Sequence, residues 1–189
     1  MPYRKVEFRV GHYYHLYNRG NNRQDIFLER ENYLFFLRRM RKYFLTDAVK
    51  VIAYCLMPNH YHLLAYLMMD DLSGIMQRFA LSYIKAFNKR YNRVGSLFEG
   101  PFEAKLVETT EYLIHLSRYI HLNPVAAGLV SKAEDWEFSS YREYIGLRNG
   151  TLPSLDVVLS HFAGRSDYQA FVEAYVEGDV EVIRHLMLD

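Results

Sequence analysis

Alternating hydrophobic and polar positions predict a strand, a helix and a hairpin in the first third of the chain. Residues 13–18 alternate aromatic and polar side chains, which is typical of a half-buried strand, and a turn rich in Gly and Asn follows. Over residues 31–44, apolar side chains recur at helical spacing with basic side chains largely opposite, which predicts an amphipathic helix. Residues 49–56 and 60–67 are apolar, β-rich runs on either side of a Met-Pro-Asn turn, and they predict a β-hairpin.

The same kind of pattern predicts a second helix and a fourth strand in the middle of the chain. Asp70 or Asp71 can cap a helix that reaches about Tyr91, because the apolar residues between them recur at helical spacing. A Gly-containing connection then leads to a short strand at 102–107. The order β, α, β, β, α, β indicates an α+β fold of the ferredoxin-like (split βαβ) type, with helices on one face of an antiparallel sheet. The other face is expected to stay available for a ligand.

A third helix follows the fourth strand and carries two polar side chains of interest. Either threonine of residues 109–110 can cap it, and helical spacing places Tyr119 and Asn123 on one face, one turn apart. Pro124 disfavours the α conformation at the residue before it. We therefore expect this helix to stop near Leu122, with the Asn123 side chain at or just beyond its end.

The last part of the chain is expected to be an acidic extension. Residues 136–144 and 168–188 are interpreted as helical or loop-like. The acidic cluster in this part consists of Glu173, Glu177, Asp179 and Glu181. We therefore divide the chain into a main domain over residues 1–145 and an acidic helical extension over residues 146–189.

Composition fits one domain with an extension. The chain has 189 residues, of which 50% are hydrophobic, and this is enough to fill a sizeable core. The apolar runs are far shorter than a membrane span, and the N-terminal residues lack the apolar core of a signal peptide. We therefore expect a cytoplasmic protein with no membrane partner. The single cysteine, Cys55, lies in an apolar run and is expected to be a buried hydrophobe rather than a nucleophile.

Net charge is nearly balanced overall but is divided unevenly along the chain. Residues 1–110 carry 17 Lys+Arg against 10 Asp+Glu, whereas residues 111–189 carry 6 against 12. This imbalance suggests a polyanion-facing basic surface on the first part and a tail that can screen it; an ordinary solvated surface is the alternative. The candidate contacts with the phosphates of a polyanion are Arg19, Arg23, Lys85, Lys89, Arg90 and Lys105.

Two histidines in the predicted hairpin are the strongest candidates for chemistry. His60 and His62 are two residues apart, so a strand projects both from one face, where they can hold one metal ion. An isolated pair of this kind is more often structural. The helix face with Tyr119 and Asn123 can add a nucleophile and an amide oxygen. Two imidazoles with oxygen donors suit Mg or Mn and leave positions for phosphate oxygens, whereas the lack of thiolate ligands argues against structural zinc.

Four separate segments carry a family resemblance. They are Asn18-Arg-Gly-Asn-Asn-Arg-Gln24, Met57-Pro-Asn-His-Tyr-His62, Tyr119-Ile-His-Leu-Asn-Pro-Val125 and Ser139-Ser-Tyr141. Together they resemble the HUH single-tyrosine transposases, and most closely the REP-associated tyrosine transposases of bacteria. The resemblance extends from about residue 13 to residue 144, and nothing beyond it matches a family motif.

The resemblance implies a site and a reaction. His60, His62 and Asn123 would bind the metal, and Tyr119 would attack a phosphodiester of single-stranded DNA. Cleavage would give a 5′-phosphotyrosine and a free 3′-hydroxyl, with rejoining that needs no ATP, at hairpins of the repetitive extragenic palindrome type. Residues 1–145 would be the catalytic domain. Related transposases can exchange the tyrosine helix between chains, so both a monomer and a homodimer stay open.

Each site residue also has a structural interpretation. Tyr119 is one of 17 tyrosines, and without its partner motifs it would be interpreted as a core residue. Asn123 before a proline is also a common end of a helix. His115, one turn before Tyr119, is a conceivable helper in its deprotonation. Two other functions compete with a transposase: a catalytically quiet, domesticated protein that binds DNA hairpins, and a metal-dependent phosphodiesterase that uses water.

Overall fold

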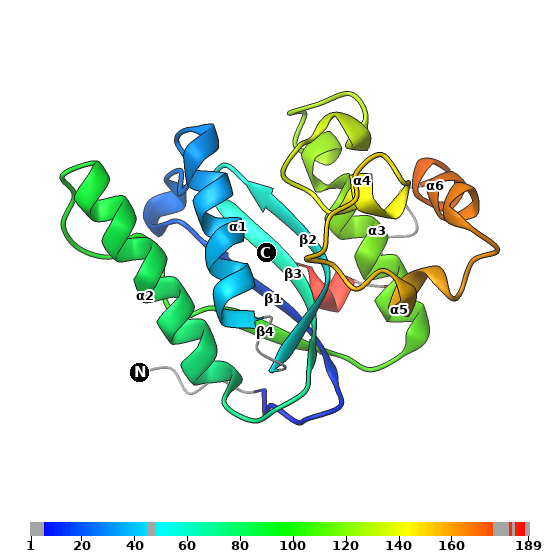
Figure 1. Ribbon diagram of the computed structural model, residues 1–189, viewed down its shortest axis with the longest axis horizontal. Helices are drawn as coiled ribbons and strands as arrows, with labels where there is room; N and C mark the ends of the chain where they lie inside the picture. Colours follow the sequence, from blue (N-terminus) through cyan, green and yellow to red (C-terminus); the bar gives the residue numbers. More distant parts are fainter. Residues whose placement is uncertain (1–5, 45–47, 176–181, 183, 188–189) are drawn as a thin grey trace.

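A four-stranded antiparallel sheet lies at the centre of the protein, in the strand order β2-β3-β1-β4. The computed structural model in Figure 1 describes residues 6–44, 48–175, 182 and 184–187. The strands are β1 (Tyr13–Arg19), β2 (Val49–Met57), β3 (His60–Leu67) and β4 (Glu103–Val107). Two helices, α1 (Arg30–Phe44) and α2 (Leu72–Arg90), complete the order β, α, β, β, α, β. The predicted ferredoxin-like α+β fold is confirmed.

The two helices α1 and α2 lie side by side on one face of the sheet (Figure 1). Alternation along β1 turns Tyr14 and Leu16 into this layer, where both are fully buried. Aromatic rings from the helices fill the rest of it, and Phe36 and Phe79 meet edge to face with their centroids 4.8 Å apart. This apolar layer holds β1 and β3 in register, so the opposite face of the same strands is free to carry polar residues.

The second face of the sheet is covered by α3 (Thr110–Ala126) and by the helices that follow it (Figure 1). These helices are η2 (Ala133–Asp135), α4 (Tyr141–Tyr144), α5 (Asp156–Leu159) and α6 (Arg165–Glu173). The expectation that this face stays open is wrong for most of its area, because Ile52 and Leu64 of the sheet are buried against Leu116 and Ile120 of α3. Space for a ligand is therefore restricted to the edge where α3 meets the ends of β1 and β3.

Helix α3 continues past its proline, contrary to the expected stop near Leu122. Pro124 lies inside the helix and is buried. Proline has no N–H, so the helix loses the bond to the Ile120 carbonyl. The next turn is nevertheless formed, since the N–H groups of Ala127 and Leu129 donate to the carbonyls of Asn123 and Pro124, both at 2.9 Å. Asn123 is therefore a helical residue, one turn after Tyr119 on the same face.

Both predicted helix caps are present. The Asp71 carboxylate accepts a hydrogen bond from the Gly74 N–H at 3.0 Å, and the Thr109 hydroxyl accepts one from the Tyr112 N–H at 3.1 Å. A Cβ at position 74 would lie 2.3 Å from the Asp71 carboxylate oxygen, so any larger residue there would displace the capping side chain. These caps fix where α2 and α3 begin.

The described part of the extension packs onto α3 and β2. Tyr168 and Val172 of α6 are fully buried in the same cluster as Ile52 of β2. Within residues 168–188, which are predicted to be helical or loop-like, α6 ends at Glu173 and a short 3-10 helix, η3, spans Arg184–Leu186. The cluster members Glu177, Asp179 and Glu181 lie outside the described residues, and the division at residue 145 stays a prediction. Among the residues that the structure describes, no helix is long and apolar enough to span a membrane.

Candidate active site

The ends of β1 and β3 place the two histidines side by side. In the antiparallel pairing, Arg19 lies opposite His60 and Tyr17 lies opposite His62. Residues directly opposite each other point to the same face, which here is the face covered by α3. His62 is fully buried and His60 is half-buried. The predicted pairing of His60 and His62 on one face is therefore present in the structure.

A tight turn after β1 brings basic residues to this edge. The Gly20 N–H donates to the Asn59 carbonyl at 2.8 Å, which ties the turn to the residue before His60. A Cβ at position 20 would lie 2.0 Å from the Gln24 carbonyl oxygen, so only glycine fits there. The Asn-Arg-Gly-Asn-Asn-Arg segment thus has a structural reason: it holds Arg19 and Arg23 close to His60.

His62 has one ring nitrogen bonded and one that no described residue satisfies. Its Nδ1 lies 3.0 Å from Nε2 of His15, a fully buried histidine of β1. Its Nε2 is buried and has no hydrogen-bond partner. Burial lowers the pKa of His62 well below its usual value, and the neighbouring His15 and His60 lower it further. His62 is therefore neutral near pH 7, which is the state in which imidazole binds metals.

His60 faces two amide groups. Its Nδ1 lies 2.6 Å from Oδ1 of Asn59, and its Nε2 lies 3.5 Å from Oδ1 of Asn123 on α3. Burial lowers the pKa of His60, Asn123 opposes the shift and Arg19 adds to it. In the neutral ring, an N–H at Nδ1 donates to Asn59 and leaves a lone pair on Nε2 facing another acceptor, the Asn123 oxygen. Two facing acceptors form a place suited to a cation.

Tyr119 lies beside the same histidines. Its ring meets the His62 ring at 77°, with centroids 5.5 Å apart, and the His15 ring at 83°, with centroids 6.5 Å apart. Together with Asn123, Tyr175 and Met187, it lines a cavity of about 200 Å³. The predicted nucleophile and the predicted third ligand are thus brought to the histidine pair by one helix.

The donor set fits a hard divalent ion, on grounds of its chemistry. Within the described ranges, no group of three or more His, Cys, Asp or Glu side chains is close enough to hold a metal. A metal here would therefore use the nitrogens of His60 and His62 with the amide oxygen of Asn123, and complete its shell with substrate or solvent oxygens. The unpartnered Nε2 of His62 supports this fit, since a buried polar atom without a partner is rare in proteins.

Cys55 and His115, the two other candidates from the sequence, make contacts that give them structural roles. The pKa of Cys55 is raised by burial, and its thiol lies against the sulfur of Met57 at 3.7 Å, so it is the buried hydrophobe that was predicted. His115 accepts a hydrogen bond at Nδ1 from the Arg118 guanidinium at 2.9 Å. The His115 ring also packs against Phe171 of α6, with centroids 5.6 Å apart. These contacts give His115 a part in holding α6 against α3.

The six basic candidates fall into two groups on opposite layers of the protein. Arg19 and Arg23 lie at the site edge, where Arg19 pairs with Glu99 at 2.9 Å. Lys105 of β4 is on the same face, opposite His15 in the pairing, and donates to the Met187 carbonyl. The other three, Lys85, Lys89 and Arg90, lie on α2. The structure therefore does not join all six into one surface.

The α2 group has basic neighbours that the sequence analysis did not assign. Arg38 of α1 and Arg90 of α2 line the same depression between the two helices, and Arg90 pairs there with Glu29 at 2.6 Å. The basic residues on the outer side of α1 are Arg38, Arg39, Arg41 and Lys42. The signal for them was the basic face opposite the apolar face of the predicted helix at 31–44.

His15 and Tyr17 are the site residues that sequence reasoning missed. Their rings lie 4.9 Å apart, and the Tyr17 ring lies 6.3 Å from the His62 ring. The period of two along β1 already placed both on one face, but no motif indicated that this face would meet His62.

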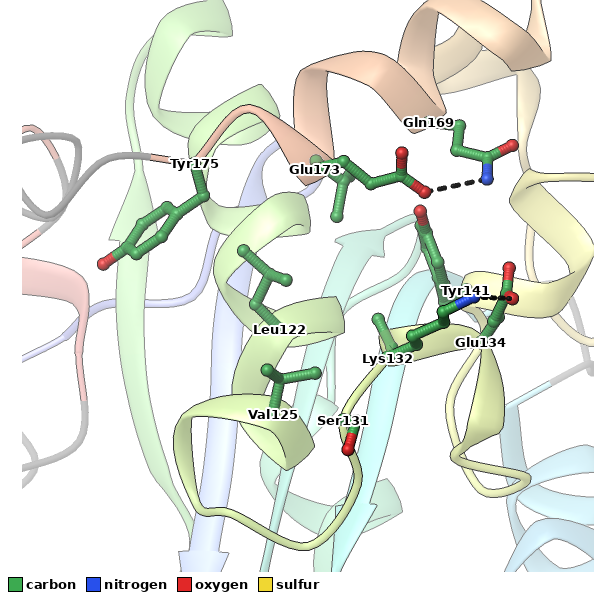
Figure 2. Close-up of a pocket in the computed structure, with 11 residues that line it drawn as sticks. Leu122, Val125, Ser131, Lys132, Glu134, Tyr141, Gln169, Glu173 and Tyr175 are labelled. Carbon is green, nitrogen blue, oxygen red and sulfur yellow. Dashed lines mark hydrogen bonds and ion pairs between the residues drawn. The ribbon is translucent and has the colours of Figure 1, made fainter.

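A larger cavity lies on the other side of α3. It has a volume of about 480 Å³ and lies between α3, the loop after it and α6, with Lys132, Glu134, Tyr141, Gln169 and Glu173 among its polar walls (Figure 2). It shares Leu122, Val125 and Tyr175 with the smaller cavity at Tyr119. It is lined by neither Tyr119 nor Asn123, so we place the chemistry in the smaller one.

Comparisons with known proteins agree with this geometry. A protein from Haemophilus influenzae (strain ATCC 51907 / DSM 11121 / KW20 / Rd), assigned provisionally by name to the REP-associated tyrosine transposases, is 27% identical over 106 residues. The match covers 49% of this chain and 58% of that protein, so the chain spans little more than half the length of this relative. A solved structure of a REP-associated tyrosine transposase bound to a REP hairpin superposes with a TM-score of 0.65 at 20% identity, covering 84% of this chain and 97% of that one. At this identity the superposition shows a shared fold.

The family itself is shown by a match of greater extent. The family model described as "Transposase IS200 like" matches residues 9–123, which is more than half of the chain and includes β1, both histidines, Tyr119 and Asn123. The resemblance found in the sequence is thereby confirmed: the chain belongs to the IS200-like transposase family.

Proposed function

We propose that this protein is a metal-dependent transposase that cleaves and rejoins single-stranded DNA at hairpin-flanked sites, with Tyr119 as its nucleophile. The observation that supports this most strongly is that α3 brings Tyr119 and Asn123 together to a buried histidine pair with an unpartnered nitrogen. A water-dependent phosphodiesterase would not need a tyrosine at this position.

Cleavage is a transesterification that conserves the number of phosphodiester bonds. The Tyr119 hydroxyl oxygen bonds to phosphorus and loses its proton, while the bond from phosphorus to the 3′ oxygen breaks and that oxygen leaves as a hydroxyl. The product is a 5′-phosphotyrosine. Rejoining is the reverse, in which a 3′-hydroxyl attacks the phosphotyrosine and releases Tyr119. No nucleotide hydrolysis is needed, which agrees with a chain that has no Walker-type loop.

The histidines and Asn123 would hold a divalent ion such as Mg or Mn. When bound, the ion supplies neutralisation of phosphate charge and helps a phenol with an ordinary pKa of about 10 to lose its proton. His60 and His62 remain neutral at working pH because burial lowers the pKa of both. Tyr119, Tyr175 and Met187 line the cavity where the phosphotyrosine would form.

The proposed substrate is hairpin DNA of the repetitive extragenic palindrome type, in the bacterial cytoplasm. The support is the solved neighbour described as bound to a REP hairpin, together with the basic residues of both layers. Arg19 and Arg23 lie at the site edge, where they can contact phosphates next to the scissile bond. In this fold α3 packs against the sheet of its own chain, which supports a site built by one chain; a homodimer that exchanges α3 is the alternative.

The test is a covalent adduct on a denaturing gel. Purified protein is incubated with labelled single-stranded hairpins and Mg or Mn. We expect a denaturant-resistant protein–DNA species with the natural chain and none with Tyr119→Phe, because only the hydroxyl is removed. Tyr112→Phe is the matched control: Tyr112 lies on the same helix, two turns away, and its ring contacts His185. We expect it to form the adduct normally.

Two results would contradict the proposal. An adduct that persists in Tyr119→Phe would show that another group is the nucleophile. Tight hairpin binding without an adduct under any divalent ion would instead indicate the quiet hairpin-binding protein.

A further inference from the structure

We infer that His15 is a positioning residue that fixes the tautomer and the ring orientation of His62, so that His62 presents the lone pair of Nε2 to the metal. This rests on the proposed function only in so far as His60 and His62 bind a metal. No motif of the family resemblance includes His15, and it touches no other proposed ligand in the described contacts.

The two rings are held against each other by the sheet. His15 Nε2 lies 3.0 Å from His62 Nδ1, and the rings are nearly parallel, at 21° with centroids 5.1 Å apart. His15 is directly opposite Leu64 on β3, which makes His62 its diagonal neighbour on the same face. Diagonal positions are within reach of aromatic rings, so the backbone register alone directs the two imidazoles toward each other.

One proton is shared between these two nitrogens, and its location decides whether His62 can bind a metal. If His62 donates from Nδ1, its Nε2 carries a lone pair directed at the site. If His15 donates instead, His62 Nε2 must carry an N–H that is buried without an acceptor among the described residues. An unpaired buried polar atom costs about 1–3 kcal/mol in either tautomer, but a metal ion can satisfy only the lone pair, because an N–H cannot become a metal ligand.

Burial keeps water away from the hydrogen bond between His15 and His62. Both histidines are fully buried, so water does not compete for His62 Nδ1. Tyr17 and Tyr119 contact the faces and edges of the rings, with Tyr17 4.9 Å from His15 between centroids. These contacts restrict ring rotation, and the hydrogen bond then selects between the two tautomers. Metal-binding histidines commonly gain their orientation from a partner at the second nitrogen, and here that partner is another buried imidazole.

The experiment uses the full chain without metal and then with Mn²⁺. Histidine tautomers are identified by two-bond ¹H–¹⁵N NMR correlation in ¹⁵N-labelled protein, and Mn²⁺ affinity is measured by calorimetry. In the natural chain we expect His62 to carry its proton on Nδ1. His15→Phe keeps a ring but removes the acceptor, so we expect a mixed His62 tautomer and Mn²⁺ affinity lowered by about 10–100-fold.

His15→Gln is the matched control, because its amide oxygen can occupy the place of Nε2 and accept the same hydrogen bond. We expect it to restore the Nδ1–H tautomer and to bring Mn²⁺ affinity within about threefold of the natural chain. Equal loss in both variants would show a merely structural role and would overturn the inference. An Nε2–H tautomer of His62 in the natural metal-free chain would overturn it without any variant.

The outcome is separable from that of the proposed function. If the natural chain binds Mn²⁺ with the expected tautomer but forms no Tyr119 adduct, the transposase proposal fails and the role of His15 stands. If adducts form while His15→Phe retains both tautomer and affinity, the role of His15 fails and the transposase proposal stands.

Discussion

Two fully buried histidines on the α3 side of the sheet, His62 and His121, have opposite surroundings. His121 of α3 has both ring nitrogens bonded, with Nδ1 2.7 Å from the Tyr168 hydroxyl and Nε2 2.7 Å from the Ser140 hydroxyl. His62 has one nitrogen bonded and the other directed at the site without a described partner. The number of satisfied nitrogens, rather than burial, therefore separates a structural histidine from a candidate ligand.

The bonds around His121 form a directed chain across three elements. One proton assignment keeps every contact of 3.0 Å or less: Ser140 donates to His121, His121 to Tyr168, Tyr168 to Ser117, and Ser117 to the Ile114 carbonyl. Ser140 in turn accepts from the Tyr54 N–H of β2 at 2.9 Å. This chain joins α3 to β2 and α6, and so helps to fix the position of the helix that carries Tyr119.

Substitution of His62 is expected to have the largest effect on activity. We expect His62→Ala to lower the rate of adduct formation by about 10³-fold, since a catalytic metal contributes several kcal/mol. Hairpin binding should change little, and the midpoint of urea unfolding should fall less than in a His121 variant, because His62 has one described hydrogen-bond partner and His121 has two. His161→Ala is the control, because His161 is exposed. Normal cleavage by both His62→Ala and His60→Ala would remove the metal assignment.

Substitution of His121 is expected to lower stability and to leave metal binding nearly unchanged. His121→Ala leaves Ser140 and Tyr168 with unpaired buried groups and creates a cavity, so we expect the free energy of unfolding to fall by about 2–4 kcal/mol. Urea denaturation followed by circular dichroism measures this. Mn²⁺ affinity at temperatures where the variant is folded should stay within a few-fold of the natural value. A variant as stable as the natural chain would show that the hydrogen-bond chain is dispensable.

The burial of His121 should also make the stability of the protein depend on pH. Burial lowers the pKa of His121 to about 3, whereas an exposed histidine titrates near 6.5. Below pH 6.5 the unfolded chain therefore takes up a proton that the folded chain does not, and stability falls as the pH is lowered toward 3. The expected loss is about 1.4 kcal/mol per pH unit for one such group.

Denaturation at several pH values from 7 to 5 measures this slope. The glutamine in the variant His121→Gln cannot titrate. The slope of the free energy of unfolding against pH should therefore be smaller by up to about 1.4 kcal/mol per pH unit over this range. Identical slopes in the two proteins would show that folding does not shift the pKa of His121.

The smallest expected effect is on DNA binding by lysines of α2, which contact neither His62 nor His121. Lys85→Gln and Lys89→Gln remove exposed charges of α2, far in the sequence from the site. If each contacts a phosphate, the slope of log affinity against log salt should decrease by about 0.7 per residue for single-stranded DNA. Lys132→Gln, at the cavity beside α6, is the control. Unchanged slopes in both α2 variants would exclude this helix from the DNA interface.

Much of this arrangement was accessible from sequence because its signals are local. The strand at 60–67, the caps at Asp71 and Thr109, and the shared helix face of Tyr119 and Asn123 all follow from short-range spacing. The helix end was wrong because proline penalises one hydrogen bond, and burial of the Pro124 ring against the fold outweighs that penalty.

Other features could not be predicted, because they depend on contacts between distant segments. His15 and His62 are 47 residues apart, and so are His121 and Tyr168. No periodicity or motif states which of two buried histidines will have a free nitrogen. Only strand register and helix packing decide it.

The continuation of α3 through Pro124 makes Tyr119 and Asn123 parts of one rigid rod. A displacement of that rod away from β3 would withdraw the Tyr119 hydroxyl and the Asn123 amide oxygen from the histidines in a single movement. If these two groups act as proposed, reactivity and ion retention are mechanically linked, and a partner that moves α3 outward would switch both off together.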